Sequence, residues 1–398
     1  MRDLLPEEAR RRRALGRRLL AHFALHGYQL VTPPAFELAE VLERGLGTLD
    51  PTDVLRFVEP ESGEIAALRP DMTPQIARMV ATRLTHEPRP IRLCYEGTVV
   101  RRRQGRARRH RQVPQAGVEL YGAPGIAGDL EILRLAASVA RCCGLPEFVV
   151  DLGHAAVARS LLEALPRALA ADVSDALAQK DTSRIAALLA DTNSPPAVAR
   201  ALSALPELHG ADDAVFDRAA PLLAGTPAEA PALELRALWD TARRSDPELA
   251  AALRIDLGEV RGFAYYTGAI FHLLAPGPGE PFGAGGRYDD LLRRFDAPMP
   301  ATGFALHLDA VAWALEAAGV ADERPPAVLV VAGDRAEALA QALRALEIPA
   351  VIHAAEGAEA HARAWYFSHL ITEGAITKID PESSLDSDVL ARVVSGVR

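Results

Sequence analysis

The sequence of 398 residues contains little cysteine, lysine or aromatic side chain. Cys94 stands alone and Cys142 and Cys143 are adjacent, so no CxxC pair exists. This makes a zinc ribbon, a thioredoxin-type redox site or a disulfide framework a poor interpretation. Only two of the 44 basic residues, Lys180 and Lys378, are lysine, and the rest are arginine. Together with heavy use of alanine, this bias indicates the base composition of the genome rather than a function.

The chain also lacks a long apolar segment. No run of about 18 apolar residues occurs, so no membrane span is expected. Met1–Arg18 is strongly charged, unlike a signal peptide, and we therefore expect a cytoplasmic protein. The net charge of −9 argues against a chain-wide nucleic-acid binder but leaves room for a local basic patch. With 49% hydrophobic residues the sequence can form a sizeable core.

The residue composition and the hydrophobic pattern change along the sequence. Residues 1–153 and 251–322 mix strand-like and helix-like patterns, and we expect them to form one core domain. Residues 154–250 are rich in alanine and leucine, with proline and capping residues between, and predict a helical insertion. Arg324-Pro-Pro326 is typical of a linker, and residues 327–398 begin with a strand–helix–strand pattern that predicts a small α/β appendage.

Within these regions, apolar spacing and turn residues predict individual elements. Helices are expected at residues 7–26, 36–44, from 73 onward, 128–143, 309–318 and 335–346. Strands are expected at residues 28–31, 55–58, 65–68, 91–103, 112–121, 148–152, 255–257, 265–274, 302–306, 327–331 and 349–353. We expect the tail from residue 379 to be partly ordered at best.

The first candidate site segment is Ala67-Leu-Arg-Pro-Asp-Met-Thr-Pro-Gln75. A strand is expected to bring Arg69 and Asp71 to a turn, where Thr73 caps a helix and Pro74 takes its first position. A carboxylate and a hydroxyl beside a helix start can hold an ammonium group. An ordinary capping arrangement with a surface carboxylate fits the same residues.

The second candidate segment is the strand Gln112–Glu119. Because side chains alternate along a strand, Gln115, Gly117 and Glu119 are expected to share one face. Two polar side chains with a glycine between them can form the floor of a pocket for a cationic or hydrogen-bond-donating ligand such as an imidazole. A half-polar strand without a ligand fits the spacing equally well.

Three other segments carry possible ligand groups. Arg261-Gly-Phe-Ala-Tyr-Tyr-Thr-Gly268 combines an arginine with Tyr265 and Tyr266 and is typical of a ligand wall. Phe282–Asp290 is rich in glycine, which lets a backbone approach a ligand, but it does not match the Rossmann spacing. The loop 101–111 holds seven arginines, which suit phosphate or carboxylate. A solvated hairpin loop in an arginine-rich protein is the alternative for that loop.

Taken together and in this order, the segments resemble the catalytic core of histidyl-tRNA synthetase over roughly residues 1–320. Leu68–Thr73 is similar to that family's Leu-Arg-Pro-Glu-Gly-Thr segment, and Arg261–Gly268 to its Arg-Gly-Leu-Asp-Tyr-Tyr motif. Ala284–Asp289 is similar to its Ala-Gly-Gly-Arg-Tyr-Asp motif. The resemblance implies the α+β fold of a class II aminoacyl-tRNA synthetase. That fold is an antiparallel sheet flanked by helices, here with the insertion and the appendage added, and it usually forms a dimer.

The departures from the family pattern fall in the ATP half of the site. The second class II motif has an arginine and, two residues later, a glutamate; here Arg101 is kept but Arg103 stands at the glutamate position. The third motif has a glycine and an arginine where His307 and Ala310 stand here. Losing that arginine removes a charge-assisted contact with phosphate. The appendage is also short and not basic for an anticodon-binding domain. The resemblance therefore implies a degenerate ATP site and no aminoacylation.

The histidine half of the site is retained in part. The resemblance places an α-ammonium group against Asp71, Thr73 and Gln115, an imidazole against Glu119 and Tyr266, a carboxylate against Arg261, and Tyr265 in the wall. Whether histidine binds this pocket or a subunit interface stays open at this point.

This profile resembles the regulatory subunits of short-form ATP phosphoribosyltransferase. Pro70–Gln75 and Asp151-Leu-Gly-His154 are also similar to that group. The resemblance implies a non-catalytic chain that dimerises and joins a separate catalytic subunit in a hetero-octamer. The chain is then required for activity and for feedback inhibition by L-histidine of the first step of histidine biosynthesis.

No cofactor, metal, membrane or nucleic-acid partner is expected. The alternatives are a degenerate but active histidyl-tRNA synthetase, which Arg261 keeps open, and a tRNA- or RNA-binding paralogue that uses the arginine-rich loop.

Overall fold

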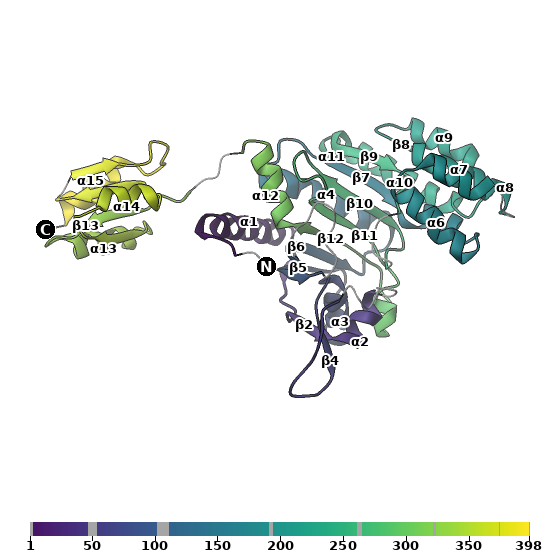
Figure 1. The fold of residues 1–398 in the computed structure, drawn as a ribbon, viewed down its shortest axis with the longest axis horizontal. Coiled ribbons are helices and arrows are strands. Elements are labelled where there is room, and N and C mark those ends of the chain that lie inside the picture. The colour runs from purple at the N-terminus through teal and green to yellow at the C-terminus, as the bar shows by residue number, and fades with distance from the viewer. Residues whose placement is uncertain are drawn as a thin grey trace. The chain divides into compact units, whose positions relative to one another are not determined.

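The computed structural model describes residues 3–46, 54–101, 111–190, 194–260, 265–320, 324–373 and 375–397 (Figure 1). Contacts divide the chain into two compact units, Met1–Val320 and Ala321–Arg398, and each is described by itself. Among the described residues, no helix combines the length and the apolar character needed to cross a membrane.

Within the described residues, a nine-stranded sheet organises the larger unit, in the order β1-β5-β6-β12-β11-β10-β7-β9-β8. Its neighbouring strands are antiparallel except for the pairs β1–β5 and β7–β9. The prediction of a class II-type antiparallel sheet is thereby confirmed. The strands are β1 (Gln29–Leu30), β5 (Ile91–Val100), β6 (Gln112–Tyr121), β7 (Val149–His154), β8 (His209–Gly210), β9 (Leu253–Asp256), β10 (Ala269–Leu274), β11 (Gly283–Arg287) and β12 (Ala301–His307).

Strand β11 lies in the glycine-rich segment, where the sequence pattern predicts no strand. Glycine is needed there because the strands pack closely. A Cβ on Gly285 would lie 2.5 Å from both the Gly303 carbonyl oxygen and the Cβ of Phe304. The glycines of this segment therefore serve the close packing of the sheet.

Helices α1 (Pro6–Leu25), α4 (Gly125–Cys143) and α12 (Leu308–Ala317) pack together against the sheet and bury a large apolar core. Leu19 and Phe23 of α1 are fully buried, and the Phe23 ring meets the ring of Phe304 edge-on at 6.1 Å. Arg13 and Arg17 of the same helix are exposed. The amphipathic pattern of the sequence is thus the pattern of burial in the structure.

A smaller layer lies beside this sheet and carries the first site segment. It consists of a three-stranded sheet in the order β2-β4-β3 and two helices. The bounds are β2 (Phe36–Leu38), α2 (Ala39–Leu46), β3 (Arg56–Val58), β4 (Ile65–Leu68) and α3 (Thr73–Arg83). The predicted helix 36–44 is wrong in its first turn, because residues 36–38 pair with β4 before the helix begins.

The segment between β7 and β9 is helical, with a short strand. It contains α5 (Ala155–Leu162), α6 (Arg167–Ala178), α7 (Thr182–Ala190), α8 (Pro196–Ala204), α9 (Ala214–Leu223), α10 (Glu229–Ser245) and α11 (Pro247–Ala252). A 3-10 turn at Leu205–Glu207 leads into β8, which closes the edge of the main sheet. Trp239 is fully buried among these helices, and its indole N–H donates to Asp213.

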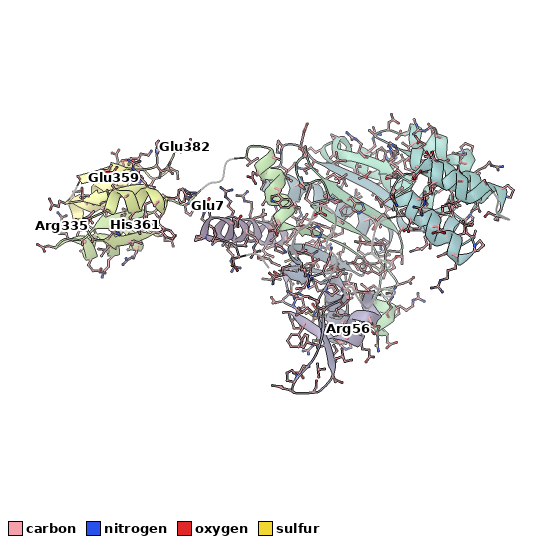
Figure 2. The ribbon with its side chains drawn as sticks, in the orientation of Figure 1. Glu7, Arg56, Arg335, Glu359, His361 and Glu382 are labelled. Carbon is pink, nitrogen blue, oxygen red and sulfur yellow. The ribbon has the colours of Figure 1, made fainter. Side chains whose placement is uncertain are left out.

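The smaller unit is an α/β sheet in the order β14-β13-β15-β16. Its elements are β13 (Val328–Val331), α13 (Ala336–Ala345), β14 (Ala350–His353), α14 (Ala358–Ala364), β15 (His369–Thr372), β16 (Ala375–Lys378) and α15 (Ser387–Gly396). We expect the tail to be partly ordered at best, but α15 buries Leu390. Arg335, labelled in Figure 2, donates to the carbonyl of Val394 at 2.6 Å. Packing against the rest of the unit orders a segment that looks weakly structured in sequence.

Candidate functional site

The first two predicted site segments meet on one face of the large sheet. The register of β6 pairs Glu119 with Leu93 of β5 and with Gly303 of β12. The turn between β4 and α3 brings Thr73 above this strand, where its hydroxyl donates to Oε1 of Glu119 at 2.6 Å. Residues 46 positions apart in sequence therefore share one buried hydrogen bond.

Thr73 does not cap α3 through its side chain, contrary to the prediction. The helix begins at Thr73 itself, and its backbone N–H donates to Oδ1 of Asp71 at 3.3 Å. The capping role falls to the carboxylate, and the hydroxyl is free to turn toward Glu119. Asp71 also accepts from the phenol of Tyr265 at 2.8 Å, which ties this turn to the segment expected to form the ligand wall.

A cluster of tyrosines surrounds the two carboxylates. The rings of Tyr265 and Tyr266 lie 5.0 Å apart, and Tyr265 meets Tyr288 edge-on at 5.5 Å. The Tyr288 hydroxyl donates to Oε2 of Glu119. A Cβ at Gly303 would lie 2.7 Å from the Tyr288 hydroxyl, so glycine at that position makes this contact possible.

Tyr288 is a site residue that the sequence reasoning missed. It stands in the segment resembling Ala-Gly-Gly-Arg-Tyr-Asp, which was treated mainly as a glycine-rich run. Tyr95 and Tyr121 were also missed, and both are fully buried near the same carboxylates. Their signal was an aromatic residue on the same predicted strands as the polar site residues. Five of the seven tyrosines in the chain thus gather around this site.

Gln115 lies on the same strand as Glu119, two alternations away, and is 1% exposed. Its side-chain oxygen Oε1 is buried and has no hydrogen-bond partner among the described residues. A buried amide oxygen without a partner is costly, so a donor from a ligand would be favoured there. The room beside Gly117 is filled by the Tyr95 hydroxyl, 2.5 Å from where a Cβ would be, so this glycine accommodates a side chain.

The site is electrostatically unusual because its carboxylates are buried. Burial raises the pKa of Glu119 well above its ordinary value, and the hydrogen bond from Thr73 offsets this only in part. The nearby Asp71 charge raises the same pKa further. Burial and Asp71 likewise raise the pKa of Tyr265, so that phenol remains a hydrogen-bond donor. A bound ligand with a positive charge would favour the charged form of Glu119 and so lower its pKa again.

The structure describes only some of the residues that are expected to mark a degenerate ATP site. Arg103 and Arg261 lie outside the described residues. Arg101 donates through Nε to the carbonyl of Pro70 at 3.1 Å, next to the first site segment. His307 ends β12 opposite Gln115, and Ala310 is buried in α12. A methyl group at position 310 cannot make the phosphate contact that an arginine makes.

Two other arginines of the motif segments have structural partners. Arg69, expected at the site turn, donates to the backbone carbonyls of Pro33 and Thr98 at 2.8 and 2.9 Å. Arg69 therefore holds the turn against these two backbone segments, and its role is structural. Arg287 forms a buried pair with Asp129 of α4 at 2.9 Å, which joins β11 to the helical layer.

No group of metal-ligand type is formed by Asp71 and Glu119 with their neighbours. Among the described residues, only Asp151, Asp256 and Glu259 bring three potential ligand atoms within 4.8 Å of one another, and they lie elsewhere.

The sheet, its covering helices and the site on its open face define a histidyl-tRNA synthetase-like protein of class II fold. A family model described as histidyl-tRNA synthetase matches residues 1–311. A crystal structure of an ATP phosphoribosyltransferase regulatory subunit/histidyl-tRNA synthetase from Bacillus halodurans is similar, with a TM-score of 0.81 and 26% identity. The match covers 93% of this chain and 96% of that one.

Curated relatives narrow this class. The ATP phosphoribosyltransferase regulatory subunit of Anaeromyxobacter sp. (strain K) is 44% identical over 320 residues, 79% of this chain and 90% of that protein. The protein of the same name from Moorella thermoacetica is 40% identical over 309 residues, 77% of this chain and 78% of that protein. The chain belongs to the family of ATP phosphoribosyltransferase regulatory subunits. These relatives are named as regulatory rather than catalytic chains, which agrees with the prediction of a non-enzymatic subunit.

Proposed function

We propose that this chain is the regulatory subunit of a short-form ATP phosphoribosyltransferase and carries the L-histidine signal in feedback inhibition. A separate catalytic subunit, in the cytoplasm, joins ATP to phosphoribosyl pyrophosphate, the first step of histidine biosynthesis. The regulatory chain is required for that activity, and the two chains form a hetero-octamer. The names of the relatives support the partnership.

The observation that carries the histidine assignment is the buried acceptor set. Thr73 and Tyr265 connect Glu119 and Asp71 to one another's segments, and Gln115 adds an unpartnered buried oxygen on the strand that carries Glu119. The α-ammonium group of histidine would meet Asp71, Thr73 and Gln115. Its imidazole would meet Glu119 beside Tyr266, its carboxylate would meet Arg261, and Tyr265 would pack in the wall. By the family resemblance, His307 and Ala310 would replace the glycine and the arginine of the nucleotide site.

Regulation then follows from differential binding. Histidine inhibits only if it binds one conformation of the complex more tightly than the active one. A preference of about 1–3 kcal/mol gives roughly 5–150-fold coupling between histidine and catalysis. The buried, tyrosine-lined site suits this role because a ligand bound there would change the hydrogen-bond partners of two carboxylates at once.

Isothermal titration of the full chain with L-histidine tests the assignment. We expect binding to wild type and a large loss in Glu119→Ala or Glu119→Gln, because a hydrogen bond to a charged group contributes about 1.5–3 kcal/mol, or roughly 10–150-fold in affinity. Glu163→Gln is the matched control, since that carboxylate is largely exposed on the end of α5. Histidine affinity that is unchanged in the Glu119 variants would refute the assignment.

We also propose that the chain dimerises through the outer face of the three-stranded sheet. Phe36, Leu38 and Phe57 share that face by register, and each is more than a third exposed. The rings of Phe36 and Phe57 meet edge-on at 5.5 Å, so the apolar area is continuous. Exposed apolar patches of this kind mark protein interfaces.

A further inference from the structure

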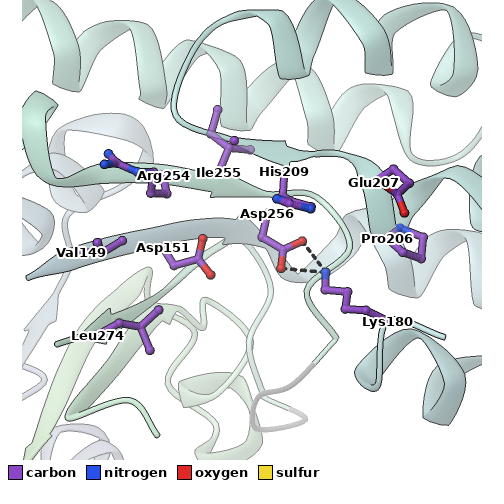
Figure 3. A pocket seen from close by; sticks show the side chains of 11 residues that line it. Val149, Asp151, Lys180, Pro206, Glu207, His209, Arg254, Ile255, Asp256 and Leu274 are labelled. Atoms are coloured by element: carbon purple, nitrogen blue, oxygen red, sulfur yellow. Dashed lines mark hydrogen bonds and ion pairs between the residues drawn. The ribbon is translucent and has the colours of Figure 1, made fainter. Parts of the chain in front are cut away.

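A cavity lies on the large sheet, lined by residues other than those of the tyrosine-lined site. It has a volume of about 500 Å3 and forms where β7, β8 and β9 meet the turn after α6 and the 3-10 turn before β8 (Figure 3). That size falls within the range of roughly 300–1,000 Å3 that small-molecule sites occupy. Nothing in the proposed histidine site uses its residues.

The two sites share one face of the sheet. Directly paired residues point to the same side, and the pairing runs from Glu119 through Gly303, Gly286 and Ile270 to Gly153. Asp151 lies two residues before Gly153 on β7, so it faces the same side. The cavity therefore lies on the face of the sheet that carries the proposed histidine site.

One ion pair shapes the cavity. Lys180, which has a left-handed backbone (φ 54°), donates to both oxygens of Asp256 at 2.6 and 2.7 Å. The backbone N–H of Gly258 donates to the same carboxylate at 2.9 Å. These three bonds provide Asp256 with hydrogen-bond partners and connect the helical segment to β9. They leave the third ammonium proton of Lys180 for another acceptor. The side chain of Lys180 is 34% exposed.

Charges of opposite sign stand side by side at the other end of the cavity. Asp151 on β7 is the direct ladder partner of Arg254 on β9, so the two side chains leave the same face one strand apart. Arg254 uses Nη1 for the carbonyls of Ala251 and Leu253. Among the described residues no acceptor meets its Nε or Nη2, so that edge of the guanidinium can take a carboxylate.

The Lys180 ammonium also makes this a poor site for a metal ion. Asp151, Asp256 and Glu259 hold ligand atoms within 4.8 Å of one another, but a divalent ion on Asp256 would lie against a positive charge that already bonds both of its oxygens. Val149, Pro206 and Leu274 add apolar wall to the same cavity. Paired charges with an apolar wall suit a small organic zwitterion.

We infer that this cavity binds a free α-amino acid. The ammonium group of the ligand meets Asp151, its carboxylate meets Arg254 and the free N–H of Lys180, and its side chain lies against Val149 and Leu274. The ligand has its own site, separate from Glu119, so the inference does not depend on histidine binding in the tyrosine-lined pocket.

Titration calorimetry of the full-length Glu119→Gln chain with each of the common L-amino acids, one at a time, tests the inference. The Glu119 change removes the other proposed amino-acid site from the measurement. We expect at least one amino acid to bind, and to lose at least tenfold in affinity when Asp151→Asn or Arg254→Ala is added. The amide of the same amino acid, which lacks the carboxylate, should bind at least tenfold more weakly to the unaltered cavity.

Val149→Phe provides a second test of the inference. It narrows the cavity without changing any charged residue, and it should also weaken the binding of the amino acid. Three results overturn the inference: no amino acid binds with a Kd below about 10 mM, binding is unchanged by the Asp151 and Val149 substitutions, or Mg2+ binds there in place of any amino acid. If Glu119→Gln abolishes the binding of histidine, that result supports the proposed function and neither supports nor overturns the inference about this cavity.

Discussion

Replacing Glu119 by glutamine should stabilise the ligand-free protein at neutral pH while it weakens the binding of histidine. In the wild type, Glu119 is 1% exposed, and burial raises its pKa well above the ordinary value of 4.5. The folded state therefore holds a proton that the unfolded chain releases. This contribution to stability is fully present below the unfolded pKa and is lost as pH rises toward the folded pKa.

The magnitude follows from linkage. Each pH unit between the two pKa values costs the wild type about 1.4 kcal/mol, which gives at most about 3 kcal/mol between pH 5 and pH 7. Glutamine does not titrate, but it gives up one of the two acceptor oxygens that serve Thr73 and Tyr288, at a cost of about 1 kcal/mol. The variant should thus be slightly less stable near pH 5 and more stable near pH 7.

Urea unfolding of the full chain, followed by tryptophan fluorescence, measures this difference, since Trp239 is fully buried in the larger unit. The other titrating groups are common to both proteins, so the difference between them isolates Glu119. Glu163→Gln should show no such pH trend. A difference in stability that stays constant from about pH 5 to pH 7 would refute the account of Glu119 as a buried carboxyl with a raised pKa.

Three further predictions concern other parts of the molecule. Arg287→Ala should lower the free energy of unfolding by about 3–5 kcal/mol in urea titrations, because it leaves the Asp129 carboxyl buried without its partner; a loss under about 1 kcal/mol would contradict this. Phe57→Glu should shift the protein from dimer to monomer in light scattering after gel filtration, whereas Glu64→Gln should not; a dimer that survives Phe57→Glu excludes this face. Histidine-dependent exchange of pyrophosphate with ATP should be absent, since Ala310 cannot hold a phosphate; measurable exchange would revive the synthetase alternative.

Local periodicity was enough to predict most of the individual strands and helices because burial follows it, whereas the prediction of an antiparallel sheet came from the family resemblance. Alternation in Gln112–Glu119 correctly placed Gln115 and Glu119 on one face. Helix α1 followed its apolar spacing in the same way. These features depend on the spacing of apolar and polar residues along the chain, which can be read directly from the sequence.

The parts that could not be predicted depend on close contacts between distant segments. Thr73 looked like a helix cap, and only the position of β6 shows that its hydroxyl donates to Glu119. Arg69 was expected at the turn, but no local pattern shows that the carbonyls of Pro33 and Thr98 accept its donors. Tyr288 reaches the site because it directly follows the glycine-rich strand β11. Glycine has a low propensity for strands, so the sequence did not predict β11.

The most direct test of regulatory function is reconstitution with a purified short-form ATP phosphoribosyltransferase catalytic subunit. The rate of ATP and phosphoribosyl pyrophosphate condensation is measured with and without this chain, across a titration of L-histidine. We predict that activity rises when this chain is added, that histidine inhibits the complex, and that the Glu119→Gln complex needs at least tenfold more histidine for the same inhibition. A catalytic subunit that is equally active and equally inhibited by histidine without this chain would contradict the account.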